Sequence, residues 1–371
     1  MTVKLKLESL EAFRGIAAVL IILFHSQIYS LITHNRFIGN SFLFVDFFFV
    51  LSGFVMIYVY DDRLNKLSEI VPYITLRFGR IYPLHLVILL AWLGYILTKY
   101  IVFVNYGLGH DPTIVNNVKS FTLNILLLHS MGFLTEGSWN DPSWSISVEF
   151  YTYLVFAAFC LLPNAKKIRP YLAPLIVFLS YYYLLNTTTR TDLNIVYDFG
   201  IFRCIGGFFS GVTVYYLFKG KLFSIKRGNT IFEASALAFL IYMTTVSSQN
   251  ITLQMITLLS FSIVVLIFSV QSSGHISKLL HLRPFQVIGR YSYSIYMLHA
   301  LILDLCSNIF EYIFKYQFTE IDGDNYIVLG EFTGFIVNIS MVLLVIYISS
   351  FTYKYVENYY RLKFRAISNK L

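Results

Sequence analysis

Residues 10–33 read Leu10-Glu-Ala-Phe-Arg14-Gly-Ile-Ala-Ala-Val-Leu-Ile-Ile-Leu-Phe-His25-Ser-Gln-Ile-Tyr-Ser-Leu-Ile-Thr33, and this stretch decides the fold. From residue 15 to residue 33 there is no Asp, Glu, Lys or Arg, so the run is long enough to cross a bilayer as a helix. Arg14 and His25 are eleven residues apart, which returns to nearly the same helix face roughly 16 Å further along. Because an imidazole that deep in hydrocarbon is costly unless it faces a polar interior, both are site candidates. The alternative is that Arg14 reaches the headgroups and His25 is a packed core histidine.

The composition is that of a polytopic membrane protein. The chain has 371 residues, of which 57% are hydrophobic and 13% charged, and its mean hydropathy is +0.66. These values exclude an ordinary soluble globular domain. We therefore expect an all-α fold with about ten transmembrane helices, at about residues 10–33, 42–60, 81–104, 145–163, 171–187, 195–218, 231–247, 251–270, 291–316 and 327–353.

The basic residues give the expected orientation of these helices. Alternate connections and the two ends of the chain carry 22 Lys and Arg residues, whereas the opposite connections carry five. By the positive-inside rule both termini are expected in the cytoplasm. The same asymmetry accounts for the net charge of +8, so no nucleic-acid partner is expected.

The whole chain, 1–371, reads as one transmembrane domain, with no appended soluble domain and no removable signal peptide expected. A shorter apolar run at 121–133 predicts a re-entrant or interfacial helix. The three cysteines lie in apolar runs without metal-ligand spacing, so neither a disulfide nor a metal site is expected. The oligomeric state is left open.

Several polar residues lie inside the predicted spans. Asp46 lies near the outer end of the second span, and the small pair Ser52-Gly53 lies near its middle, where simple helix packing is the alternative to a binding role. Glu149 lies about a turn and a half inside the fourth span, where an unpaired carboxylate is expensive. Arg203 in the sixth span needs an anion, for which Asp46 and Glu149 are both available.

Two arginines three residues apart, Arg77 and Arg80, share one helix face at the predicted cytoplasmic surface. Guanidinium groups so placed suit phosphate binding, although every inner loop is basic for topological reasons. Trp144 at the start of the fourth span fits either an interfacial belt or an acceptor entrance. Tyr296 and His299 in the ninth span are candidates for a substrate channel, with core packing as the equal alternative, and His299 is expected about two turns in from the cytoplasmic end.

Five short motifs occur in one order over about residues 8–300, and together they resemble the acyltransferase-3 family of integral-membrane acyltransferases. The motifs are Arg14 followed by ten residues and His25, Asp46-Phe-Phe-Phe-Val-Leu-Ser52-Gly53-Phe54, Arg77-Phe-Gly-Arg80-Ile-Tyr-Pro83, Pro142-Ser-Trp144-Ser-Ile-Ser-Val-Glu149 and Ser292-Tyr-Ser-Ile-Tyr296-Met-Leu-His299. The fourth is the most specific, because it fixes five residue types over eight positions. Phe150 stands where many relatives carry a second acidic residue, which weakens any two-carboxylate mechanism.

The resemblance implies a bacterial O-acetyltransferase of the cell inner membrane. Such an enzyme moves an acetyl group from acetyl-CoA, or another acyl-CoA, to a hydroxyl of a surface polysaccharide such as lipopolysaccharide or exopolysaccharide, or of its lipid-linked precursor. Arg14, Arg77 and Arg80 would hold the CoA phosphates, and the acyl arm would rise past Ser52-Gly53. No metal is implied, and membrane lipids are the remaining expected partners.

For the chemistry, neutral His25 would act as general base, a role suited to a group that titrates near neutrality. Glu149 would orient the imidazole or bind the acceptor, and Trp144, Arg203, Asp46, Tyr296 and His299 would bind substrate. Direct transfer and a transient acyl-enzyme both remain open at this point. The alternative function is a transporter or flippase that binds a lipid-linked glycan at these charged residues without covalent chemistry.

Overall fold

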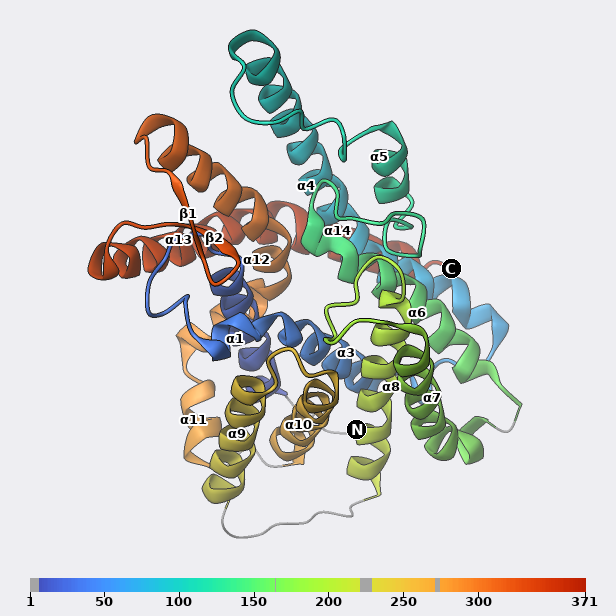
Figure 1. Cartoon of the computed structure of the whole chain (residues 1–371). Helices are drawn as coiled ribbons and strands as arrows, with labels where there is room; N and C mark the ends of the chain where they lie inside the picture. Colours follow the sequence, from blue (N-terminus) through green and yellow to red (C-terminus); the bar gives the residue numbers. More distant parts are fainter. Residues whose placement is uncertain (1–6, 164, 221–228, 271–273) are drawn as a thin grey trace.

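The computed structural model describes residues 7–163, 165–220, 229–270 and 274–371. Two segments counted in the charge argument, residues 1–6 and 221–228, lie outside the described residues. The described chain is a helical assembly with one small hairpin, which confirms the predicted all-helical polytopic fold (Figure 1). In this part of the chain, eight helices are long and apolar enough to cross a membrane.

Each of the ten predicted spans corresponds to a helix. These helices are α1 (Glu8–Phe24), α3 (Phe44–Tyr60), α4 (Ile70–Tyr106), α6 (Trp144–Leu161), α7 (Ala165–Thr187), α8 (Gly200–Lys219), α9 (Asn229–Val246), α10 (Ile251–Val270), α12 (Arg283–Asn308) and α13 (Glu331–Thr352). α1 and α9, with 17 and 18 residues, are the two that are not among those eight, whereas α3 and α6 have the same lengths but are extended at their starts by 3₁₀ turns.

Shorter elements connect and extend these helices. They are α2 (Arg36–Gly39), α5 (Val118–Ile125), α11 (His275–Leu280), α14 (Asn358–Ser368), the 3₁₀ turns η1 (Ser41–Leu43), η2 (Leu67–Glu69) and η3 (Asp141–Ser143), the π-helical segments η4 (Ile309–Ile313) and η5 (Tyr353–Glu357), and the antiparallel strands β1 (Phe318–Ile321) and β2 (Asp324–Ile327). The apolar run predicted at 121–133 forms only the short α5 and then turns.

Glycines allow the helices around the site to approach closely. A Cβ atom on Gly53 of α3 would lie 1.8 Å from the carbonyl oxygen of Phe208 on α8. In the same way, a Cβ on Gly289 of α12 would lie 2.2 Å from the carbonyl oxygen of Glu11 on α1. Only glycine fits these contacts, because the obstructing atoms belong to backbone. The pairs α3–α8 and α1–α12 therefore form the closest helix contacts around the site.

The first helix differs from its prediction, because it ends at Phe24 and not near residue 33. The following segment is held by distant partners instead. Asn338 of α13 accepts a hydrogen bond from Ser26 Oγ at 2.5 Å and donates to the Ile28 carbonyl at 3.0 Å, and Ile28 also bridges to Ile327 of β2. These contacts replace the helical hydrogen bonds that the apolar run alone would have made.

Two helices that carry predicted site residues begin well before their predicted starts. Because α4 starts at Ile70, Arg77 and Arg80 lie within it, and its later half extends beyond the body of the bundle in Figure 1. Because α12 starts at Arg283, His299 lies sixteen residues inside the helix, more than four turns and not two.

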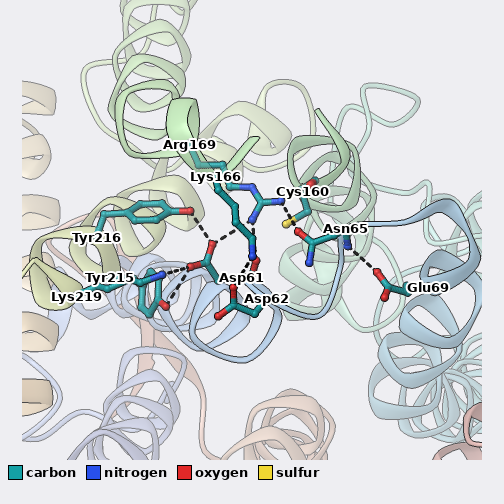
Figure 2. A network of polar contacts seen from close by, with 10 residues as sticks. All are labelled: Asp61, Asp62, Asn65, Glu69, Cys160, Lys166, Arg169, Tyr215, Tyr216 and Lys219. Carbon is teal, nitrogen blue, oxygen red and sulfur yellow. Dashed lines mark hydrogen bonds and ion pairs between the residues drawn. The ribbon is translucent and has the colours of Figure 1, made fainter. Parts of the chain in front are cut away.

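A buried carboxylate ties three helices together at the end of α3 (Figure 2). Asp61 accepts from Arg169 Nη1 of α7 at 3.1 Å and from Lys219 Nζ of α8 at 2.7 Å. The hydroxyls of Tyr215 and Tyr216 also donate to it, at 3.3 and 3.1 Å. Asp61 and Arg169 are both buried, so this network fixes the ends of α3, α7 and α8.

Candidate active site

A cavity of about 280 Å³ lies between α1, α3, α4, α6 and α12, and we call it the arginine cavity. Its polar lining residues are Arg14, Ser52, Tyr60, Arg77, Arg80, Ser145, Glu149, Tyr153, Ser292, Tyr293 and Tyr296. The structure therefore brings together the three predicted arginines, Ser52, Glu149 and Tyr296, although they come from five helices. His25 is not among the residues that line this cavity.

The three guanidinium groups differ in how they are held. Arg77 donates to Met56 Sδ at 3.2 Å and to the Tyr60 hydroxyl at 3.4 Å. Among the described residues, no hydrogen bond or ion pair holds the guanidinium of Arg14 or Arg80. Their donors are therefore free for an anionic ligand, and planar guanidinium forks match phosphate oxygens.

Glu149 is bound within the arginine cavity. The Tyr153 hydroxyl donates to Glu149 Oε1 at 2.7 Å and lies 3.1 Å from Ser52 Oγ. Ser52 lines the cavity, whereas its neighbour Gly53 faces Phe208 across the helix contact described above. The predicted small pair is thus divided between the cavity and helix packing.

His25 lies directly after α1, as its C-terminal cap. Its Nδ1 is 2.9 Å from the carbonyl oxygen of Ile21. Because a carbonyl has no proton to give, Nδ1 carries the hydrogen and donates it, which leaves the Nε2 lone pair available in the neutral ring. This is the tautomer that a general base acting through Nε2 needs.

Two more cavities meet at His25. The smaller, of about 190 Å³, is lined by His25, Asp141, Trp144, Arg203 and Tyr296 among others, and we call it the histidine cavity. It shares Val45 and Tyr296 with the arginine cavity. The larger, of about 810 Å³, lies between α4 and α12 and is called the α4–α12 cavity. His25 is the residue that lines both.

Tyr296 and His299 stand next to His25 on α12. The Tyr296 hydroxyl donates to the Pro142 carbonyl at 2.7 Å and accepts from Ser145 Oγ at 2.9 Å, so the ring is fixed between the arginine and histidine cavities. The buried His299 ring lies 4.9 Å from that of His25, centroid to centroid, and its Nδ1 is 2.6 Å from the Tyr296 carbonyl. His299 lines none of the three cavities.

Asp46 and Arg203 form a buried ion pair. Arg203 Nε lies 3.0 and 3.2 Å from the two carboxylate oxygens, and Nη2 lies 2.6 Å from Oδ2. The sequence left Asp46 and Glu149 as possible partners of Arg203, and in the structure Arg203 pairs with Asp46. The Arg203 guanidinium also lies over the Trp144 ring, 5.1 Å from its centroid. Arg203 and Trp144 therefore line the histidine cavity in contact with each other, and Asp46 is paired with Arg203.

Sequence reasoning missed three contributors to this site. Asp141, three residues before Trp144, is the carboxylate that acts electrostatically on His25 and lines the histidine cavity. The Tyr197 hydroxyl donates to it, and burial together with the Asp141 charge raises the pKa of that phenol, which stays protonated. Glu357 in η5 faces Arg80 and Arg14 and accepts from Ser294 Oγ at 2.8 Å. Asn338 holds the segment after His25.

One of these had a local signal. Asp141 stands in the Trp139–Glu149 segment, directly before Pro142 of the fourth motif, so its closeness to predicted site residues is visible in the sequence. For Glu357 and Asn338, the sequence of the C-terminal helices offers no comparable motif. Their relevance depends on partners more than sixty residues away.

Comparison with known proteins shows which family and which relatives the chain resembles. Residues 7–354 match a family model described as an acyltransferase domain. The chain is 22% identical to the peptidoglycan O-acetyltransferase OatA of Listeria monocytogenes over 82% of this chain and 50% of that protein, and 30% identical to the acyltransferase MdmB of Streptomyces mycarofaciens over 44% of this chain and 42% of that protein. It is also 34% identical to protein 2 in the picA locus of Rhizobium radiobacter, over 25% of this chain and 47% of that protein.

The chain spans about half the length of the curated relatives that it matches. No solved structure matches it significantly. The family match covers nearly the whole chain and includes every residue predicted for the site. The chain therefore belongs to the acyltransferase-3 family of membrane proteins.

Proposed function

We propose that this acyltransferase moves an acetyl group from cytosolic acetyl-CoA to a hydroxyl of a cell-surface glycan or of its lipid-linked precursor. The observation that carries the proposal is the position of His25, with Nδ1 held by Ile21 where two cavities meet. The printed name of the Listeria relative, an O-acetyltransferase of peptidoglycan, supports oxygen as the acceptor atom.

The donor enters through the arginine cavity. Arg14, Arg77 and Arg80 bind the phosphates of the CoA moiety, and the thioester arm extends past Ser52. Val45 and Tyr296 line both this cavity and the histidine cavity, so the acyl end reaches His25 along their surface. In this proposal the arginines lie on the cytoplasmic side, which is the side expected for them from the basic loops, and the enzyme lies in the cytoplasmic membrane.

At His25 the reaction is a direct transfer. Nε2 removes the proton of the acceptor hydroxyl while the oxygen attacks the thioester carbonyl carbon. The tetrahedral intermediate collapses, the C–S bond breaks, and the imidazolium returns the proton to the sulfur. The products are an O-acetyl ester and CoA with a free thiol. Asp141 stabilises the positive charge that the imidazole carries between the two proton transfers.

The test is transfer of label from acetyl-CoA to extracted surface glycan, using membranes with equal amounts of each variant. His25→Ala is expected to lower the rate about 10²–10⁴-fold, the usual contribution of a general base. His34→Ala is the matched control, because His34 lies nine residues away beside Asp322 and outside the three cavities. Equal labelling by wild type and His25→Ala contradicts the proposal.

Donor binding is tested separately with Arg80→Gln. Loss of a charge-assisted contact of about 1.5–3 kcal/mol raises KM for acetyl-CoA roughly 10–100-fold with little change in kcat. Arg36→Gln, at an exposed arginine of α2, is the control and leaves KM unchanged.

Labelled acyl-protein trapped after incubation with donor alone argues for an acyl-enzyme and against direct transfer.

A further inference from the structure

The α4–α12 cavity has a size and lining suited to an extended polar ligand. At about 810 Å³ it is within the range of cavities that bind drug-sized molecules. His25 lies at one wall, and Trp92, Tyr312 and Phe318 provide aromatic surface. The buried indole N–H of Trp92 has no acceptor among the described residues, so it is a donor that a bound ligand can satisfy.

The charges around this cavity are predominantly negative. Asp111, Asp304 and Glu311 line it, against the single lysine Lys99. Lys99 is already paired with Asp304 at 3.4 Å, so among the described residues no Lys or Arg pairs with the other two carboxylates, Asp111 and Glu311. Asp111 accepts from the backbone N–H and hydroxyl of Thr113, at 2.9 and 2.7 Å, and these contacts keep it ionised.

The position of Glu311 is set by an irregular part of the fold. It lies in η4, a π-helical segment that directly continues α12. Such segments change the direction of side chains relative to a regular helix and are frequent at functional sites. Glu311 is half-buried at the cavity wall, so its charge acts on whatever occupies the cavity.

We propose that the α4–α12 cavity binds the acceptor and selects neutral or amine-bearing saccharides over anionic ones. This inference rests on the proposed function, in which the acceptor hydroxyl must reach His25 from the side opposite the donor. A carboxylate or phosphate on the acceptor would face Asp111 and Glu311 without a free lysine to pair with. Like charges brought together at a partly desolvated site oppose binding, whereas an ammonium group is favoured.

The experiment uses the full-length protein in detergent and three oligosaccharides of equal length: one neutral, one with free amines and one with uronic acids. Protection against thermal unfolding reports binding without chemistry. We expect the neutral and amine-bearing compounds to bind at least about tenfold more tightly than the acidic one. Glu311→Gln should reduce this preference severalfold, whereas Glu320→Gln, at an exposed position of β1 outside the cavity, should not.

Tighter or equal binding of the acidic compound overturns the inference, as does a preference that Glu311→Gln leaves unchanged. Absence of protection by the neutral and amine-bearing compounds overturns it as well. Labelled acetyl transfer to the same compounds is measured in parallel. Selective binding without any transfer supports the cavity assignment and contradicts the proposed enzymatic function, so the two failures are distinguishable.

Discussion

Substitution of one or both residues of the buried Asp46–Arg203 ion pair tests whether the pair stabilises the fold or binds substrate. Three N···O contacts of 2.6–3.2 Å join the two side chains, and both are essentially inaccessible to solvent. The pair connects α3 with α8. Asp46→Asn removes the carboxylate charge and leaves the buried Arg203 guanidinium without its counter-ion. A buried charge without a partner is strongly destabilising.

The expected magnitude follows from that burial. Removal of one partner of a buried ion pair costs about 3–5 kcal/mol, because the remaining charge is uncompensated. Replacement of both partners, as in Asp46→Leu with Arg203→Met, removes both desolvation penalties and is expected to be nearly neutral. The double variant also loses the cation–π contact between Arg203 and Trp144, which lowers the stability that it regains by about 0.5–2 kcal/mol. The two substitutions should therefore be strongly non-additive.

The assay is thermal unfolding of the purified protein in detergent, with labelled acetyl transfer measured well below the transition. Asp46→Asn should unfold several degrees lower than wild type, and the double variant should regain most of that loss. Additive destabilisation in the double variant would refute the reasoning. A double variant that is stable but transfers no label would assign the pair to the substrate site.

Three further outcomes follow from contacts in the fold. Gly53→Ala should cost about 3 kcal/mol or more in thermal unfolding, because its Cβ meets backbone, whereas Gly94→Ala, with no atom within 4 Å, should be neutral or slightly stabilising. Asn338→Leu releases the segment that follows His25, so kcat should fall roughly 10–100-fold while KM for acetyl-CoA is unchanged in steady-state assays. Asp61→Asn should lower stability by about 2–4 kcal/mol in the same unfolding assay without changing KM for the donor.

Helix number was predictable from sequence because the bilayer imposes it. A run of about twenty apolar residues has few alternatives in hydrocarbon, where each backbone group must be satisfied within its own segment. Helix ends were less predictable, since other partners can satisfy the backbone there. Residues 25–33 are as apolar as a helix requires, yet Asn338 and β2 hold them in an irregular path. Those partners lie about 300 residues away in the sequence, so the pattern of residues 25–33 does not indicate them.

The members of the site were largely predictable, but their grouping was not. Polar residues inside apolar spans are costly, so Arg14, Ser52 and Glu149 could be selected one by one. Which of these side chains come together depends on the depth of each residue along its helix and on the neighbouring helix that it faces. The ion pair between Arg203 and Asp46 shows this, since Glu149 was an equal candidate until the helix packing was known.

The site is arranged on two levels, and the two carboxylates of the Asp141–Glu149 segment lie on different ones. Along α1 the arginine cavity comes first, at Arg14, and His25 follows roughly 16 Å later. The segment Asp141–Glu149 runs in the opposite sense, so its first carboxylate lies at the level of His25 and its second at the level of the arginines. Glu149 therefore lies in the same cavity as the three arginines, where its negative charge offsets part of their positive charge. In the proposed mechanism, Asp141 and not Glu149 is therefore the carboxylate that would stabilise an imidazolium at His25, because it lines the histidine cavity and acts electrostatically on that ring.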